Sequence, residues 1–157
     1  MKRALFSLAG VVVLVMLARV EGFACTCAPP YPTPSLKTQV RTALSEARAV
    51  FSGKVLEVTD DPQTLSVVVR LRVERSWKGS PGREVRIVTG RGGGDCGYHF
   101  EVGGSYLVYA YGSGAGGLGT NICQRTARLS EAARDLQVLG KGRGAARQPV
   151  RKGAGRL

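Results

Sequence analysis

The stretch LSVVVRLRVER, residues 65–75, is the most regular part of the chain. Apolar residues occupy every second position from Leu65 to Val73, and the alternation is broken only by Val68. A period of two is typical of a strand with one face toward a core and the other toward water. We therefore predict a half-buried strand over Leu65–Arg75.

Apolar segments on both sides of this stretch predict further short strands, separated by turn residues. Val50–Thr59 comes first, with Gly53 as a bulge or a point of close backbone approach. We expect turns at Asp60-Asp61-Pro62 and at Trp77–Gly82. Five short strands with turns between them predict an all-β core, either a barrel or a sandwich. The later strands are expected at Glu84–Thr89, Ser105–Tyr111 and Leu118–Cys123.

Two helices are expected to flank the strands. Ser35 can cap a helix over Leu36–Ala47, whose apolar residues recur at helical spacing. The prolines between Cys25 and Pro34 exclude a helix there and predict an extended path. A second helix, capped by Ser130, should end at Leu139 and place Ala132, Leu136 and Leu139 on one face.

The first 24 residues have the pattern of a secretory signal peptide. A basic start, Lys2 and Arg3, precedes a 15-residue apolar run that is short for a membrane-spanning helix. Small residues at positions 22 and 24 predict cleavage between Ala24 and Cys25. An uncleaved membrane anchor and a lipoprotein beginning at Cys25 are the alternatives. The expected location is outside the cytoplasm, extracellular or periplasmic.

Basic residues are concentrated at the C-terminal end. Cleavage would leave 133 residues with a net charge of +10, of which +6 comes from residues 140–157 and +4 from residues 25–139. We predict one monomeric domain over residues 25–139 and a basic, disordered tail over residues 140–157, which has little apolar surface to bury. The tail either stays free or contacts a polyanion such as a cell-surface polymer or an acidic lipid. Because the charge belongs mostly to the tail, it does not indicate a fold that binds nucleic acid specifically.

The chain has four cysteines, Cys25, Cys27, Cys96 and Cys123, and an even number in an exported protein predicts two disulfides. Cys25 and Cys27 would form a very tight ring with each other, so each is expected to pair with a distant cysteine. The residues alone leave open whether Cys96 or Cys123 is the partner of Cys25. A zinc site with four thiolate ligands is the alternative, but the spacing of Cys25 and Cys27 does not fit it.

Patterns that indicate catalysis are absent from the sequence. There is one histidine, His99, and no G-x-S-x-G motif, and the glycines at positions 92–94 lack the Lys and Ser or Thr of a phosphate-binding loop. A triad of His99 with Asp95 and Ser105 can be drawn, but a polar residue at a strand entrance explains His99 more simply. We expect a binding protein rather than an enzyme, with no cofactor.

Several motifs resemble the tissue inhibitors of metalloproteinases and the related netrin-like domains. Cys25-Thr-Cys-Ala-Pro-Pro30 directly after a signal peptide is similar to the N-terminus of these inhibitors, and Trp77-Lys-Gly79 to a turn of netrin-like domains. Phe51–Val55 resembles the first barrel strand of the family. The resemblance covers residues 25–139 and points to a single-domain, bacterial-type version. Cys96-Gly-Tyr98, Phe100, Gly104–Leu107 and Cys123 before a helix resemble the remaining blocks.

The resemblance implies a five-stranded, OB-like barrel (oligonucleotide/oligosaccharide-binding fold) with flanking α-helices. It also implies the disulfide pairs Cys25–Cys96 and Cys27–Cys123. The sequence departs from the family in two respects, because it lacks the cysteines for a third disulfide of the inhibitory domain and the second, disulfide-rich subdomain. The first departure concerns the rigidity of the domain, and the second removes contacts that the family makes with proteases.

The function that the resemblance implies is metalloprotease inhibition. The free α-amine and the carbonyl oxygen of Cys25 would bind the catalytic zinc of a zinc metalloendopeptidase and displace its water. Thr26 would enter the specificity pocket of the protease, and Cys27 would hold the segment in place. Ala28 and Pro29 would continue along the substrate cleft, which completes an inhibitory ridge over residues 25–29.

Two rival functions fit the same fold class. One is a netrin-like binding module of the cell envelope that has no protease target, since a fold does not determine a function. The other is a barrel that binds oligosaccharides or nucleic acid. Such a barrel needs aromatic residues clustered on one face. Here Tyr106 lies on the opposite face of its predicted strand from Tyr109 and Tyr111.

Overall fold

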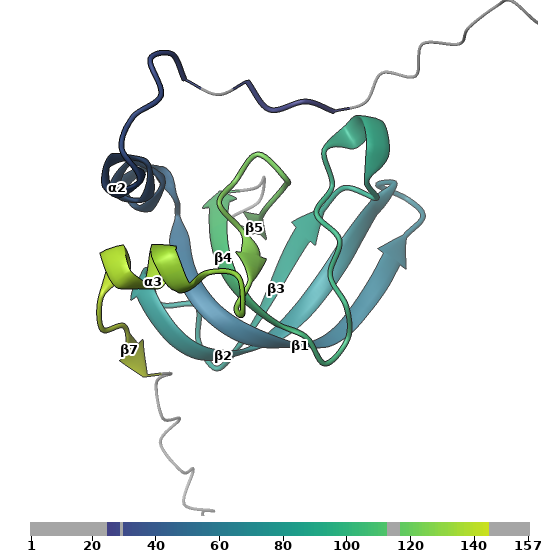
Figure 1. The fold of residues 1–157 in the computed structure, drawn as a ribbon. Helices are drawn as coiled ribbons and strands as arrows, with labels where there is room; N and C mark the ends of the chain where they lie inside the picture. Colours follow the sequence, from purple (N-terminus) through teal and green to yellow (C-terminus); the bar gives the residue numbers. More distant parts are fainter. Residues whose placement is uncertain (1–24, 29, 113–116, 145–157) are drawn as a thin grey trace, which may run out of the picture.

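The structure is a computed structural model that describes residues 25–28, 30–112 and 117–144. This part of the chain is mostly β, with two helices and two disulfides, and its strands form one sheet that contains a closed ring (Figure 1). The predicted all-β core with flanking helices is therefore confirmed at this level. In chain order the elements are α2 (Leu36–Glu46), β1 (Ala49–Asp61), β2 (Ser66–Lys78), β3 (Glu84–Thr89), the 3-10 turn η1 (Gly93–Asp95), β4 (Ser105–Gly112), β5 (Leu118–Gly119), β6 (Ala127–Arg128), α3 (Ala133–Leu139) and β7 (Arg143–Gly144).

Five strands close the ring. β1 is antiparallel to both β2 and β4, and β2 is antiparallel to β3. β5 completes the circle, because it runs parallel to β3 and antiparallel to β4. The two remaining strands extend the sheet, β6 beside β4 and β7 beside β2.

The β1–β2 hairpin agrees with the predicted pairing but turns later than predicted. Its register shifts between Ser52 and Gly53, and a Cβ at Gly53 would lie 2.7 Å from the carbonyl oxygen of Arg72, so the predicted close approach at Gly53 is confirmed. Asp61 accepts hydrogen bonds from the amide and the hydroxyl of Thr64, which places the turn after Asp61. Leu65 belongs to that turn, with φ +52° and 65% exposure, and its predicted inward position in the strand is wrong.

The second predicted turn is also displaced, because Trp77 and Lys78 continue β2. The Trp77 indole packs with the partly buried residues between the helices and the ring, and its Nε1 donates a hydrogen bond of 2.8 Å to the carbonyl of Gly140. The turn begins at Gly79, which has φ +73°. A turn at Trp77 would have exposed an indole that the fold uses for packing.

The last predicted strand is much shorter than expected. β5 ends at Gly119, whereas the prediction continued to Cys123. The Thr120 hydroxyl bonds to the carbonyl of Tyr109 and to Thr126, and Asn121 closes a turn on the residues after it. Side-chain hydrogen bonds of this kind compete with a strand ladder and end it.

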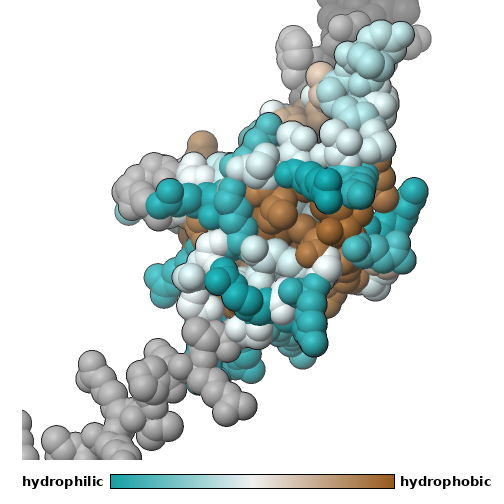
Figure 2. All heavy atoms as spheres, turned by 90° about the vertical axis from the view of Figure 1, so that its left-hand side faces the viewer, coloured by the Kyte–Doolittle hydropathy of each residue, from teal (hydrophilic) through white to brown (hydrophobic). Residues whose placement is uncertain are grey.

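Two hydrophobic clusters lie on opposite sides of the sheet. The first fills the ring and includes Phe51, Leu71, Ile87 and Tyr106. The second lies between the ring and the helices and includes Tyr109. Tyr106 is 1% exposed and Tyr109 is 0% exposed, so the predicted division of the two tyrosines between opposite faces is confirmed, and neither is available at the surface. Figure 2, which views the side occupied by the helices in Figure 1, shows hydrophobic atoms in the centre of that side, framed by hydrophilic residues.

The two helices differ in how well they were predicted. α2 begins as expected after Ser35, whose hydroxyl accepts from the amide of Thr38. α3 begins only at Ala133, and Ser130 lies in a turn before it, so the predicted cap at Ser130 is wrong. The predicted apolar face is correct, since Ala132, Leu136 and Leu139 all pack in the second cluster. Within the described ranges, no helix is long and apolar enough to cross a membrane.

The predicted basic tail begins with residues that belong to the sheet. Arg143 and Gly144 form β7 and pair with Ser76 and Arg75 of β2. Gly142 lies against the Trp77 indole, where a Cβ would come within 2.8 Å of the ring. The expected disorder of residues 145–157, like the expected signal peptide of residues 1–24, lies outside the described residues.

Candidate functional site at the N-terminal segment

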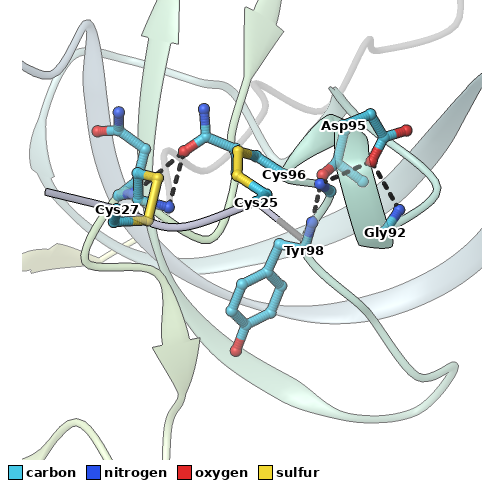
Figure 3. Close-up of a disulfide and its surroundings, with 11 residues drawn as sticks. Cys25, Cys27, Gly92, Asp95, Cys96 and Tyr98 are labelled. Atoms are coloured by element: carbon cyan, nitrogen blue, oxygen red, sulfur yellow. Dashed lines mark hydrogen bonds between the residues drawn. A yellow bond between two sulfur atoms is a disulfide. The ribbon is translucent and has the colours of Figure 1, made fainter. Parts of the chain in front are cut away.

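The N-terminal segment is attached to the rest of the molecule by both disulfides. Cys25 bonds to Cys96 and Cys27 bonds to Cys123, with Cα–Cα distances of 5.1 and 5.3 Å. The pairing that the family resemblance implied is thus present, and no disulfide joins Cys25 to Cys27. Figure 3 shows the two disulfides close together, and Figure 1 shows the segment crossing above the strands toward α2.

Side chains alternate in exposure along the segment. Cys25 and Cys27 are half-buried, whereas Thr26 and Ala28 are exposed. An extended chain points successive side chains to opposite sides, so the inward cysteines hold the backbone while the residues between them face outward. Pro29, the last residue of the predicted ridge, lies outside the described residues. Of the other four, Thr26 and Ala28 form an outward-facing strip, and Cys25 and Cys27 lie on the opposite, inward side of the segment.

Asp95 organises the loop that carries Cys96. Its two carboxylate oxygens accept hydrogen bonds from the amides of Arg91 at 2.7 Å, Gly92 at 2.8 Å and Gly97 at 2.9 Å. These amides, those of Gly97 and Arg91 foremost, lower the pKa of Asp95. The loop is therefore closed around a charged carboxylate on the residue that immediately precedes the anchor cysteine (Figure 3).

Glycines allow this loop to close tightly. A Cβ at Gly97 would overlap the carbonyl group of Gly90, and a Cβ at Gly90 would meet the Asp95 carboxylate. Cys96 itself has φ +59°, a left-handed conformation that is uncommon for a residue with a side chain. The buried Thr89 hydroxyl accepts from the amide of Tyr98 at 2.8 Å and fixes the exit of the loop to β3.

A second Asx residue organises the loop that carries Cys123. The Asn121 side-chain oxygen accepts hydrogen bonds from the amides of Cys123 at 2.9 Å and Gln124 at 3.2 Å. The amide of Ile122 donates to the carbonyl of Cys96 at 2.9 Å, which joins this loop to the first one. Both disulfide anchors therefore stand on loops that are closed by a side chain and connected by a main-chain hydrogen bond.

The far end of the N-terminal segment is held by a polar network between the helices. Gln39 of α2 donates from Nε2 to the carbonyl of Pro34 at 2.8 Å and accepts from Arg125 at 3.0 Å. Arg125 donates two hydrogen bonds, of 2.8 and 2.6 Å, to the carboxylate of Asp135 in α3. The Tyr109 hydroxyl donates to the same carboxylate. Burial and the nearby Asp135 charge raise the pKa of Tyr109, and the bond to Asp135 raises the pKa of Arg125.

The cysteines are not available as metal ligands. The sulfur atoms of Cys25, Cys96 and Cys123 lie within 4.8 Å of one another, but all four cysteines are in disulfides. A thiolate is the form of cysteine that binds zinc, so the alternative of a four-cysteine zinc site is wrong for this state of the protein.

The arrangement does not assemble the triad that can be drawn from the sequence. His99 is exposed, and among the described residues it makes no side-chain hydrogen bond to Asp95 or Ser105. The Asp95 oxygens are already occupied by main-chain amides. Ser105 is the first residue of β4, and its carbonyl accepts from the amide of Leu129.

The supporting roles of Asp95 and Asn121 were not among the predictions from sequence. Each lies one or two residues before an anchor cysteine, and Asp95 has glycines on both sides of the pair Asp95-Cys96. Asp and Asn next to glycine favour turns that are closed by their own side chains. That signal was present beside Cys96, whereas Asn121 is flanked by Thr120 and Ile122 and has no adjacent glycine.

Comparison with known proteins gives no assignment. No protein-family model matches the chain. No curated protein matches it either.

Proposed function

We propose that the protein is an exported inhibitor of zinc metalloendopeptidases, similar to the tissue inhibitors of metalloproteinases, and that it acts through Cys25. The protein has the OB-like barrel of the inhibitory domain in this proposal. After cleavage between Ala24 and Cys25, the α-amine and carbonyl oxygen of Cys25 bind the zinc of the target protease. An α-amine has a pKa near about 8 and loses its proton readily when it binds a metal.

The observation that carries the proposal is the pairing of the first two cysteines with Cys96 and Cys123. This pairing holds Cys25 in one place while Thr26 and Ala28 stay exposed on the same strip. A chelating group held in one geometry loses less entropy on binding than a free chain end does. Thr26 then enters the specificity pocket, and Ala28 and Pro29 follow the substrate cleft.

Without the third disulfide of the family, the domain needs other contacts to keep the N-terminal segment rigid. Asp95 and Asn121 supply some of these contacts, because together they bind five main-chain amides in the two anchor loops. The bond between Ile122 and Cys96 adds a link between the loops. A rigid ridge without a third disulfide is therefore physically reasonable.

Two disulfides also support export as part of the proposal. Thiols stay reduced in most cytoplasms, whereas disulfides persist in extracellular and periplasmic spaces. The two disulfides close loops of 71 and 96 residues. They stabilise the domain only while they stay oxidised, as they do in these compartments.

The test compares two forms of the exported protein against a panel of zinc endopeptidases. One form begins at Cys25, and the other carries a single added Ala before Cys25. The extra residue turns the amine into an amide, which is a poor zinc ligand, and pushes atoms into the zinc site. We expect inhibition by the first form and a loss of about 100-fold or more with the second, because the second form loses one of its two zinc contacts. A 100-fold loss corresponds to about 2.7 kcal/mol. N-terminal sequencing first establishes where the exported chain begins.

Thermal unfolding of both forms serves as the control, because the addition lies at the chain end and should leave the melting temperature unchanged. If the form beginning at Cys25 inhibits no protease, or the extended form inhibits equally well, the chelation mechanism is wrong. The netrin-like binding module of the cell envelope would then be the better function.

A further inference from the structure

Basic side chains gather on the outer face of β1–β3 and at β7. We define the basic surface as Lys54, Arg72, Arg75, Arg83, Arg86 and Arg143, all of which are exposed. Among the described residues, none of these six forms an ion pair. Arg70 lies among them, but Glu57 and Glu84 neutralise it at 3.0 and 3.1 Å. Glu74 is the one further exposed carboxylate on this part of β2.

Strand register places like charges directly opposite each other on this face. Lys54 of β1 is the partner of Arg72 of β2, and Arg70 of β2 is the partner of Arg86 of β3. Like charges in such positions destabilise a sheet. Glu57 and Glu84 compensate the second pair through Arg70, whereas the Lys54–Arg72 pair has no carboxylate partner among the described residues. That pair therefore costs stability in the isolated protein, and a bound anion would remove the cost.

The surface is hollowed rather than flat. Arg72, Arg83 and Glu84 line an open hollow of about 650 Å³ together with Gly82. Gly82 also borders a second hollow of about 250 Å³, which Arg143 lines from β7. The pairing of β7 with β2 thus places Arg143 beside the β2–β3 turn, where Arg143 also donates to the Gly79 carbonyl at 3.4 Å. The sequence after β7 adds four more basic residues, Arg147, Arg151, Lys152 and Arg156.

We infer that this surface binds an anionic polysaccharide. Guanidinium groups bind sulfate, phosphate and carboxylate groups through paired hydrogen bonds, which fits a surface made mostly of arginine. Alternate residues on one strand are about 7 Å apart, a spacing at which a polymer can present one anionic group after another. β1 and β2 curve strongly (Figure 1), and a flexible polymer follows a convex face that a flat membrane touches at few points. Nucleic acids prefer aromatic groups for base stacking, and the basic surface contains none.

The basic surface lies away from the N-terminal segment. In Figure 1 the segment crosses the top of the molecule, whereas β7 lies at the bottom. A polymer on the basic surface therefore leaves Cys25 and Thr26 uncovered. The inference does not depend on the proposed inhibition, and a failure of one leaves the other untouched.

The test measures binding of the full exported chain to dextran sulfate, with uncharged dextran as the matched polymer control. The variant Arg72→Gln/Arg83→Gln/Arg143→Gln removes three charges from the basic surface. The control variant Lys37→Gln/Arg41→Gln/Arg134→Gln removes three exposed charges from α2 and α3 and has the same net charge. We expect about 100-fold weaker binding of the first variant, since each arginine near an anionic surface contributes roughly fivefold. The slope of log affinity against log salt should fall by about one per arginine removed.

The control variant should bind within a few-fold of the wild type, and a chain truncated after Gly144 should bind more weakly but preserve the difference between the two variants. Equal losses in the two variants would mean that only net charge matters and would overturn the inference. So would a complete loss of binding on truncation. Tighter binding to vesicles of anionic lipid, or to single-stranded DNA, than to dextran sulfate would overturn the choice of polysaccharide as partner.

Discussion

The carbonyl oxygen of Cys96 accepts a hydrogen bond of 2.9 Å from the amide of Ile122, the residue before Cys123. This contact joins the two loops that anchor the N-terminal segment. Because each loop carries one disulfide, a displacement of either loop moves both Cys25 and Cys27. The support beneath the segment is therefore one connected unit, and changes to its side chains should be measurable at the ridge.

Replacing Asp95 with Ala should loosen the loop from Gly90 to Gly97 while the ring stays intact. Three amides lose their acceptor, so those of Arg91, Gly92 and Gly97 should exchange with deuterium about tenfold faster or more. Amides of the β1–β2 hairpin should exchange at wild-type rates. Exchange rates that stay unchanged at Gly92 and Gly97 would show that Asp95 does not hold the loop.

Asp95 should also make stability depend on pH. Its pKa in the folded state is lowered from 3.8, so its contribution is complete above the unfolded value and is lost as the pH falls through the folded value. We expect the difference in free energy of unfolding between the wild type and Asp95→Asn to be constant from about pH 7 to about pH 5 and to shrink below about pH 4. Urea unfolding across this range measures it. A difference that is independent of pH would contradict the assigned charge.

Gly97→Ala should destabilise the protein, whereas Gly112→Ala should not. A Cβ at position 97 would overlap main-chain atoms of Gly90, but a Cβ at position 112 meets nothing within 4 Å. We expect a loss of about 2 kcal/mol for the first and a change within about 0.5 kcal/mol for the second. Urea unfolding measures both, and the yield of oxidised protein reports whether Cys96 still reaches Cys25. Equal stabilities of the two variants would argue against the tight loop.

The contact between α2 and α3 should weaken when Asp135 is changed to Asn. Asp135 is 7% exposed and receives two hydrogen bonds from Arg125 and one from Tyr109. Loss of the negative charge leaves Arg125 without its counterion, at a cost of about 2 kcal/mol after allowance for its partial exposure. Glu101→Gln, at the exposed pair with Arg128, is the control and should have the smaller effect. The opposite order would contradict the role of the network.

Thr26→Gly should change which proteases are inhibited without abolishing inhibition. In the proposed complex, the change empties the specificity pocket of the protease but leaves the amine and carbonyl of Cys25 in place. Inhibition constants should rise by about tenfold for targets with a deep pocket, which corresponds to about 1.4 kcal/mol. Ala28→Gly, on the same exposed side of the segment, should have a smaller effect. A uniform loss across the panel, equal to that of the Ala-extended form, would mean that Thr26 acts only by positioning Cys25.

The sequence predicted those parts of the fold that depend on local pattern. The alternation in β2, the spacing of apolar residues in α2 and the single Gly53 each reflect one local requirement. All three agree with the structure, apart from Leu65 at the start of the alternation. Errors arose where a side chain bonds across the fold. Trp77 extends β2 because the second cluster receives it, and Thr120 ends β5 because Tyr109 and Thr126 lie beside it.

The candidate site shows the same division. The outward positions of Thr26 and Ala28 follow from an extended chain whose half-buried cysteines, Cys25 and Cys27, point inward. The partners of those cysteines could not be derived from spacing, because several pairings satisfy it, and they came from the family resemblance. The hydrogen bonds from main-chain amides to Asp95 were not predicted, because they depend on a loop that closes on itself and not on periodicity.

In the proposed export of the protein, the long reach of the two disulfides sets an order of events. Cys25 and Cys27 lie at the beginning of the domain, and their partners follow 71 and 96 residues later. A chain that emerges N-terminus first exposes two thiols, one residue apart, long before either partner has arrived. In that interval the thiols can join each other or another molecule. The ridge is therefore the first part of the domain to appear and the last to be fixed, and its yield should depend on how quickly wrongly paired disulfides are exchanged.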